Sequence, residues 1–197
     1  MSQDDNAVFL PGRGHLFTNE DIGAEFPFTT QSALAALDLT ADVVGDGWVN
    51  LGHTSSENNI ALSRETEGGE TKGSYQKPAL RKTNPTVVWA FNIPALQISN
   101  DVLSLYFGGG DASEPDAFYT PFVETVTERA LGIVLVDGPA RFGWGVPKVA
   151  IEAGDGAPEF DPENFMEFPL LATVLEESSA KGLMGLFRAG LGTPTAP

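Results

Sequence analysis

The sequence predicts a mainly β fold, a sandwich or barrel of about six to eight strands with one short flanking helix. Three observations support this prediction. Short runs of β-branched and aromatic residues alternate with polar ones along most of the chain. The 22 glycines and 14 prolines are many for a helical protein and suit turns between strands. Only residues 99–108 carry a clear helix pattern.

The strongest predicted strand covers residues 86–93, which are almost all β-branched or aromatic. Side chains two residues apart share one face of a strand. One face of this strand therefore carries a large apolar set: Val87, Trp89, Phe91 and Ile93. Pro94 lacks the N–H that the ladder requires, so the strand is expected to end there.

A short helix is predicted directly after this strand, over residues 99–108. Ser99 or Asn100 can serve as the N-cap, and Asp101 suits the positive end of the helix. Gly108 is a stop signal. A helix of about two turns is marginal in isolation, so it is expected to pack against the sheet.

Further strands are predicted along the chain, and residues 29–44 are left open between helix and irregular structure. The segment 131–136 is apolar on both faces, which indicates a central strand. In residues 141–146 the larger side chains share an inward parity, with Gly143 and Gly145 outward. Pro147 then reverses that parity, which predicts a bulge or strand break. The remaining predicted strands are residues 48–54, 118–127 and 165–175.

A long polar hairpin is predicted over residues 59–77. Two glycines at its tip can adopt positive φ angles, and the tip residues are Glu67, Gly68, Gly69 and Glu70. Beyond Leu62 the hairpin has almost no apolar face. Because an isolated hairpin is barely stable in water, it is expected either to remain without fixed structure or to dock on another subunit.

The single predicted domain covers residues 26–177, with an arm at each end. Residues 1–25 and 178–197 are rich in glycine, proline or charge and carry only a few apolar anchors. Such arms become ordered on a neighbour or remain disordered. The predicted inter-subunit contacts are therefore the four hairpin-tip residues and an apolar group in the second arm: Leu183, Leu186 and Phe187.

The charge is strongly acidic, with 27 Asp and Glu against 11 Lys and Arg and a net charge of −16. This composition lacks the basic footprint of a protein that grips nucleic acid. Acidity commonly serves solubility. It can also line a passage through which polyanions move without adhering. The chain has no cysteine and no long apolar run, and its first residues are acidic where a signal peptide would be basic.

No catalytic, cofactor or metal site is predicted. His15 and His53 are too few and too far apart to suggest a metal pair. Residues 108–110 are three glycines that follow a helix, whereas a phosphate-binding loop precedes one. The many carboxylates form no recognisable dyad. The sequence thus predicts a protein that is not an enzyme.

Several segments resemble a known family, the major tail tube proteins of long non-contractile-tailed bacteriophages, especially those that infect actinobacteria. The similar segments lie between residues 48 and 175: residues 48–56 (WVNLGHTSS), 88–93 (VWAFNI), 101–109 (DVLSLYFGG), 129–133 (RALGI) and 168–173 (FPLLAT). The resemblance implies a tail-tube-type β-sandwich that forms hexameric rings. The rings would stack into a hollow tube of the virion tail, through which DNA passes into the host.

The resemblance also implies partners and a place for the acidic residues. The partners would be other copies of the chain, a tape-measure protein and a tail terminator, with no membrane. Six copies at −16 each give −96 per ring, and a lumen lined by part of that charge would repel DNA phosphates. Screening limits this effect to about 8–10 Å. The sequence does not choose among the candidate lumen-facing residues: Glu65, Glu67, Glu70, Glu124 and Glu128.

Two alternatives remain open from the sequence. One is another virion piece, a tail terminator or a head decoration protein, which would form single rings or trimers. The other is a soluble β-sandwich that binds carbohydrate through Trp48, Trp89 or Trp144, although the last two have the inward parity of core residues.

Overall fold

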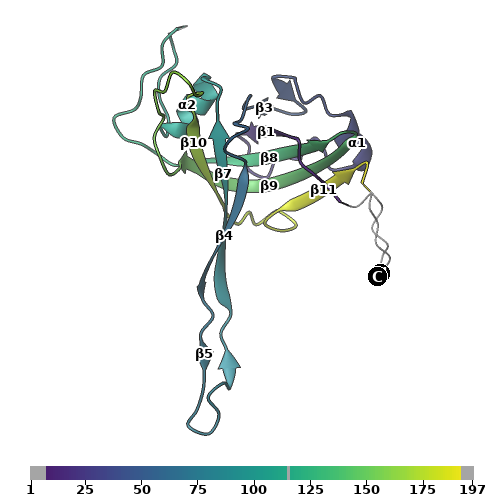
Figure 1. Cartoon of the computed structure of the whole chain (residues 1–197), viewed down its shortest axis with the longest axis vertical. Coiled ribbons are helices and arrows are strands. Elements are labelled where there is room, and N and C mark those ends of the chain that lie inside the picture. Colours follow the sequence, from purple (N-terminus) through teal and green to yellow (C-terminus); the bar gives the residue numbers. More distant parts are fainter. Residues whose placement is uncertain (1–7, 115, 192–197) are drawn as a thin grey trace.

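The computed structural model describes residues 8–114 and 116–191, and in this part of the chain the fold is mainly β, as the sequence predicts (Figure 1). Two short helices accompany the strands. In chain order the elements are β1 (Arg13–Asn19), α1 (Gln31–Ala36), β2 (Val43–Val44), β3 (Trp48–Asn50), β4 (Ala61–Gly68), β5 (Thr71–Lys72), β6 (Arg81–Lys82), β7 (Pro85–Ala95), α2 (Asn100–Tyr106), β8 (Thr127–Asp137), β9 (Ala140–Ala153), β10 (Phe168–Val174) and β11 (Gly185–Ala189).

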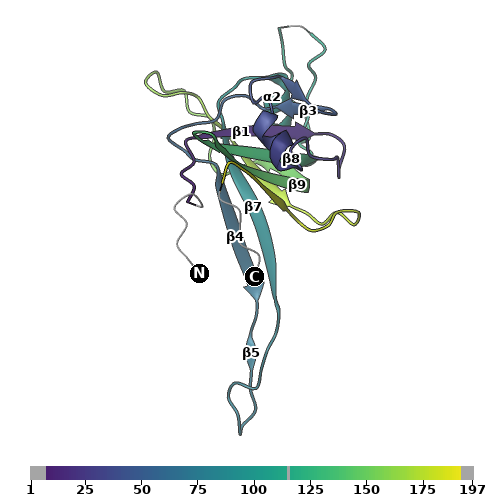
Figure 2. The ribbon, with the colours of Figure 1, turned by 90° about the vertical axis from the view of Figure 1, so that its right-hand side faces the viewer.

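Nine strands form one antiparallel sheet in the order β2-β3-β1-β8-β9-β10-β7-β4, and β11 also pairs with β9. The sheet curls until the segment after β3 reaches the end of β7. There Thr54 bridges Ala95, and the Leu96 N–H donates to the His53 carbonyl at 2.9 Å. The curled sheet encloses the larger apolar core, which α2 covers at one end (Figures 1 and 2).

A second apolar core lies on the opposite face of β8 and β9. Phe28 and Leu34, from the segment between β1 and β3, and Trp48, the first residue of β3, are fully buried there. The face they cover includes Gly132 and Gly143, which have no side chains. The Phe28 ring lies so close that a Cβ on either glycine would be 3.1 Å from it. The glycines expected to face outward are therefore a packing surface for aromatic rings. Residues on both faces of β8 are buried, which confirms its prediction as a central strand.

The predicted irregularity at Pro147 is confirmed as a β-bulge. Arg129 pairs with Val149, whereas Leu131 pairs with Val146, so two residues of β9 oppose Ala130. Proline can occupy such a position because its missing N–H is not required by the ladder. The bulge divides β9, which pairs with β11 before it and with β10 after it.

The predicted end of the strand at Pro94 is wrong, because β7 runs on to Ala95. Pro94 lies opposite Pro169 of β10. The two carbonyls point away from each other: that of Pro94 accepts from Ser55 N–H at 3.0 Å, and that of Pro169 from Gly154 N–H at 2.8 Å. The missing N–H groups would also have pointed outward, so this pair loses no hydrogen bond between the two strands.

The helix prediction holds for α2, whose N-cap is Ser99, with the Ser99 hydroxyl accepting from Val102 N–H. Gly108 follows with a φ of +66°. The expectation of a single helix is wrong, since Gln31–Ala36 forms α1 with Thr30 as its N-cap. No strand forms over residues 118–127 apart from the bridge of Tyr119 with Asp111 and the first residue of β8.

Neither predicted arm is an arm over its described part. Arg13–Asn19 forms β1, which pairs with β8 along its length and buries Leu16 and Phe17 completely. Gly185–Ala189 forms β11, which pairs with β9 and buries Ala189. Both segments look too short and too glycine-rich to fold alone, but each gains a ready-made partner strand. The arm positions 1–7 and 192–197 lie outside the described residues.

Candidate assembly surfaces

The most prominent surface is a β-hairpin that projects far from the body (Figures 1 and 2). β4 pairs with β7 from Ala61 opposite Asn92 to Gly68 opposite Pro85. β5 and β6 continue it in the same register, with Thr71 opposite Lys82. The chain reverses where Ser74 and Lys77 exchange two backbone hydrogen bonds, at 2.7 and 3.1 Å.

This arrangement corrects the predicted hairpin over residues 59–77. Its return strand is β7, the strongest strand of the sequence, and residues 67–70 lie partway along the hairpin. Gly68 and Gly69 do have positive φ angles, +82° and +78°. They lie where β4 ends and β5 begins on the same side of the hairpin, and they do not reverse the chain. The prediction failed because a two-glycine turn signal is equally compatible with a break within a long ribbon.

The outer hairpin has no apolar burial of its own. Every residue from 70 to 86 is exposed, including Tyr75, which is fully exposed, and Leu80 at 62%. A ribbon this exposed is held mainly by its own ladder hydrogen bonds, and such ribbons are marginally stable in water. Contact with another molecule would supply the missing burial.

The predicted lumen-facing residues fall on two separate parts of the chain. Glu65, Glu67 and Glu70 lie on the hairpin and are exposed. Glu124 lies on an exposed loop before β8, and Glu128 on β8 makes an ion pair with Lys148 at 2.9 Å. A single copy of the chain thus gathers the hairpin carboxylates on one ribbon and leaves the other two on the body.

The contact candidates near the C-terminus divide in the same way. Leu183 and Leu186 are 38% and 55% exposed, so both are available to a neighbour. Phe187 instead packs within its own chain against Phe26 and Phe28, with ring centroids 6.0 and 5.5 Å apart. The alternation along β11 separates an exposed Leu186 from a packed Phe187.

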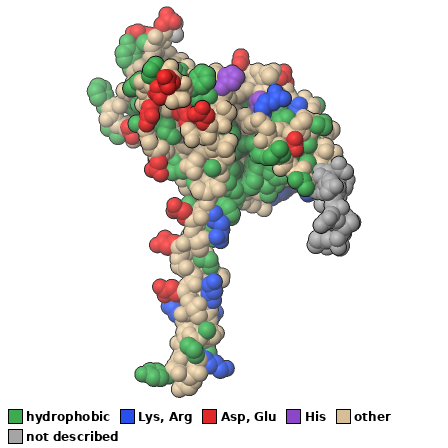
Figure 3. Space-filling model, viewed as in Figure 1, with side chains coloured by type: hydrophobic (Ala, Val, Ile, Leu, Met, Phe, Trp, Pro, Cys, Tyr) green, Lys and Arg blue, Asp and Glu red, His purple; other side chains and the backbone are tan. Residues whose placement is uncertain are grey.

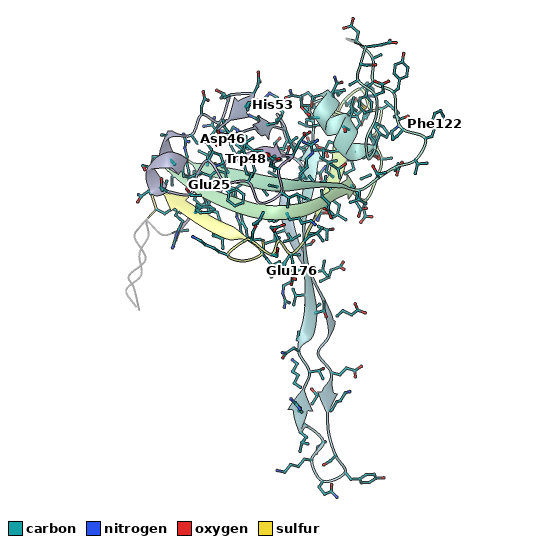
Figure 4. All side chains as sticks on the ribbon, turned by 180° about the vertical axis from the view of Figure 1, so that it is seen from behind. Glu25, Asp46, Trp48, His53, Phe122 and Glu176 are labelled. Atoms are coloured by element: carbon teal, nitrogen blue, oxygen red, sulfur yellow. The ribbon has the colours of Figure 1, made fainter. Side chains whose placement is uncertain are left out.

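An exposed apolar loop beside α2 was missed from the sequence. The sequence pattern predicted a strand over residues 118–127, in which alternate side chains would be buried. Instead Phe122 is fully exposed and Val123 and Val126 are largely exposed, and Figure 4 shows Phe122 pointing away from the body. Exposed apolar clusters of this kind mark interaction surfaces. Pro121, in the middle of the run, was the available signal against a strand.

A groove with a volume of about 830 Å³ lies at the body end of β7. Its lining comes from residues 54–59 and from parts of segments 92–96 and 154–170. It contains six carboxylates and no Lys, Arg or His: Glu57, Asp155, Glu159, Asp161, Glu163 and Glu167. Glu167 accepts from the Asn58 amide at 2.7 Å, and Asp161 from the Glu163 N–H at 2.9 Å. Hydrogen bonds from the Glu163 backbone and the Asn164 side chain lower the pKa of Asp161, so this carboxylate is charged at neutral pH.

Charges are distributed unevenly over the molecular surface. Figure 3 shows acidic side chains gathered over the body around α2, whereas Lys and Arg continue to the far end of the hairpin. Residues 71–83 hold four of the 11 basic residues and none of the 27 acidic ones: Lys72, Lys77, Arg81 and Lys82. The outer hairpin is therefore a cationic element on an acidic protein.

Potential metal ligands do not gather among the described residues. These residues contain no group of three His, Cys, Asp or Glu that could hold a metal ion. Burial, followed by the charge of Arg13, lowers the pKa of His15, which disfavours its protonated form in the fold. Within residues 8–114 and 116–191, no helix is long and apolar enough to cross a membrane.

All three tryptophans make contacts within their own chain. Trp48 is fully buried, and its indole N–H donates to the Glu25 carbonyl at 3.0 Å (Figure 4). Trp144 lies edge-to-face against Phe91 and Phe142, at 5.8 Å from each. Trp89 is partly buried, with Arg64 over its ring at 5.6 Å. The inward parity predicted for Trp89 and Trp144 agrees with their contacts with the larger core.

Comparison with known proteins finds relatives among the tail proteins of bacteriophages. The model of a family described as phage tail tube protein matches residues 1–188. The chain is 28% identical to the major tail protein Gp23 of Mycobacterium phage D29 over 180 residues, which cover 89% of this chain and 88% of that protein. It is 27% identical to the major tail protein Gp23 of Mycobacterium phage L5 over the same shares.

Proposed function

We propose, from the premise that this chain belongs to the phage tail tube protein family, that it assembles into hexameric rings that stack into a hollow tube. Membership of the family makes it a structural protein of the virion tail that assembles with its own copies. The ring, its sixfold symmetry and the passage of DNA through it are the proposed part.

The observation that carries the proposal is the outer hairpin, with every residue from 70 to 86 exposed. A ribbon without apolar burial gains stability when identical neighbours cover it. β4 is also an edge strand of the sheet. Unpaired edges promote aggregation unless they are covered, and closure by a neighbouring subunit of a ring would cover this one.

The acidic net charge fits a conduit. DNA that passed a basic wall would bind it through its phosphates, whereas carboxylates repel them. The inner wall would draw on Glu65, Glu67 and Glu70 of the hairpin and on Glu124 and Glu128 of the body.

The proposed partners are a tape-measure protein that sets the tube length and a terminator that closes it. The chain would be made in the host cytoplasm and would act without catalysis.

Electron microscopy of the purified full chain, paired with sedimentation at increasing protein concentration, tests the proposal. We expect tubes with sixfold symmetry in cross-section that grow with concentration. Closed discs that never stack would favour a tail terminator, and surface trimers a head decoration protein. Monomers at all concentrations that bind sugars would favour a carbohydrate-binding module. Any of these three results would contradict the proposed stacked rings.

A further inference from the structure

The geometry points to one specific contact between stacked copies: residues 71–83, the basic part of the outer hairpin, dock into the acidic groove of a second copy of this chain. We call residues 71–83 the basic tip. The acidic groove is the one lined by Glu57, Asp155, Glu159, Asp161, Glu163 and Glu167. This inference rests on the proposed stacking of rings and specifies which surfaces make it.

Charge segregation gives the first argument. The basic tip carries +4 from four Lys and Arg. Because the net charge of the chain is −16, the rest of the chain carries −20. Two bodies of this charge repel each other. A contact between copies therefore needs a cationic element on one side, and the tip is the most cationic segment of the chain. Opposite charges across an interface also fix its orientation and exclude wrong pairings.

Three of the basic residues outside the tip have polar partners within the chain. Arg129 pairs with Glu20 at 3.0 Å and Lys148 with Glu128 at 2.9 Å, and these are the ion pairs among the described residues. Arg141 donates to the Leu34 and Leu37 carbonyls at the end of α1. The four tip cations make none of these internal contacts, which leaves them available to a partner.

Position gives the second argument, because the tip and the groove lie at opposite ends of β7. β5 and β6 continue the ribbon beyond Pro85, whereas Asn92, Ile93 and Leu96 line the groove. A strand of 11 residues spans about 35 Å. The ribbon therefore carries the tip away from its own groove. Complementary patches at opposite ends make a head-to-tail contact, and such a contact builds an open filament when its rotation does not close into a ring.

Apolar side chains accompany the charges on both surfaces. Tyr75 at the turn is fully exposed, and Leu80 is 62% exposed. Phe165 lines the groove and is 83% exposed. Stable interfaces combine an aromatic anchor with surrounding polar contacts. The turn at Ser74–Lys77 would bring Tyr75 and Lys77 to the groove first.

Reciprocal charge reversal in the full-length chain tests this contact. The tip reversal is Arg81→Glu with Lys82→Glu, and the groove reversal is Glu159→Lys with Glu163→Lys. All four residues are exposed, so both variants should keep the melting temperature of the wild type. Each variant alone should lower the yield of sedimentable tubes at least about tenfold. Mixing the two variants should restore tubes, because the Glu tip then meets the Lys groove of the other variant and the native tip meets the native groove.

A matched control separates the contact from a general charge effect. Arg13→Glu with Lys181→Glu also reverses two exposed basic residues on the body and should assemble like the wild type. Full assembly of the tip reversal, failure of the folded mixture to recover, or an equal loss in the control would each overturn the docking. If the wild type forms tubes and neither charge reversal changes their yield, the docking is wrong but the proposed tube function is not affected. A wild type that forms no tubes would contradict the proposed function itself.

Discussion

At the scale of single residues, glycine positions decide how the second core packs. Gly132, Gly143 and Gly145 provide a shallow face of β8 and β9 on which the rings of Phe26 and Phe28 lie. A Cβ on Gly145 would approach a ring carbon of Phe26 to 2.7 Å, which is closer than packed side chains tolerate. The second core therefore depends on the absence of side chains as much as on the aromatic rings.

Gly145→Val is expected to destabilise the monomer by about 1–3 kcal/mol through overpacking against Phe26. Urea denaturation followed by tryptophan fluorescence measures this free energy of unfolding. The matched control is Gly182→Ala, since nothing lies within 4 Å of a Cβ there and its effect should stay within about 0.5 kcal/mol. Equal stability of both variants would show that Phe26 can move away without cost.

The same face shows what residue patterns could and could not predict. The alternation of Phe142, Trp144 and Val146 correctly predicted a strand, and Pro147 its bulge. The glycines between them were expected to face outward, because a glycine carries no hydrophobic signal of its own. Only the segment that supplies Phe28 and Trp48, far away in sequence, turns that face into a core.

At the scale of elements, local pattern predicted the strong strands and α2, and tertiary pairing supplied the rest. β1 and β11 carry few apolar residues, yet each pairs with a long strand of the body, β8 or β9. The hairpin strands were predicted, but their pairing was not, since a turn signal at Gly68-Gly69 competes with the true reversal at Ser74–Lys77. Strand pairing depends on long-range contacts that one sequence does not display.

The alternation along β11 gives a matched pair of substitutions. Phe187→Ala removes contacts with the rings of Phe26 and Phe28 and is expected to cost about 2–4 kcal/mol of unfolding free energy. Leu186→Ala on the adjacent, exposed position should cost less than about 0.5 kcal/mol. Thermal unfolding followed by circular dichroism measures both. A stable Phe187→Ala variant would support the original expectation that this segment belongs to an arm.

At the scale of the whole molecule, the structure combines a self-contained body with an element that is not self-contained. Two cores stabilise the body, whereas the hairpin projects from it with its side chains in solvent. The sequence could predict the lack of burial in residues 59–77, because that follows from composition. It could not predict the length of the hairpin or its placement opposite the acidic groove, because both depend on the pairing of β4 with β7 and on the loop before β10.

Hydrogen exchange compares the two regions before and after assembly. In dilute, monomeric protein, the backbone N–H groups of residues 70–86 should exchange within seconds to minutes, because a ribbon without apolar cover opens easily. In tubes of the same protein, neighbours should slow that exchange at least about tenfold, while amides of β8 stay equally slow in both states. Slow exchange of the hairpin already in the monomer would mean that it is stable without partners. Fast exchange that persists in the tubes would mean that assembly proceeds through other surfaces, such as the exposed apolar loop around Phe122.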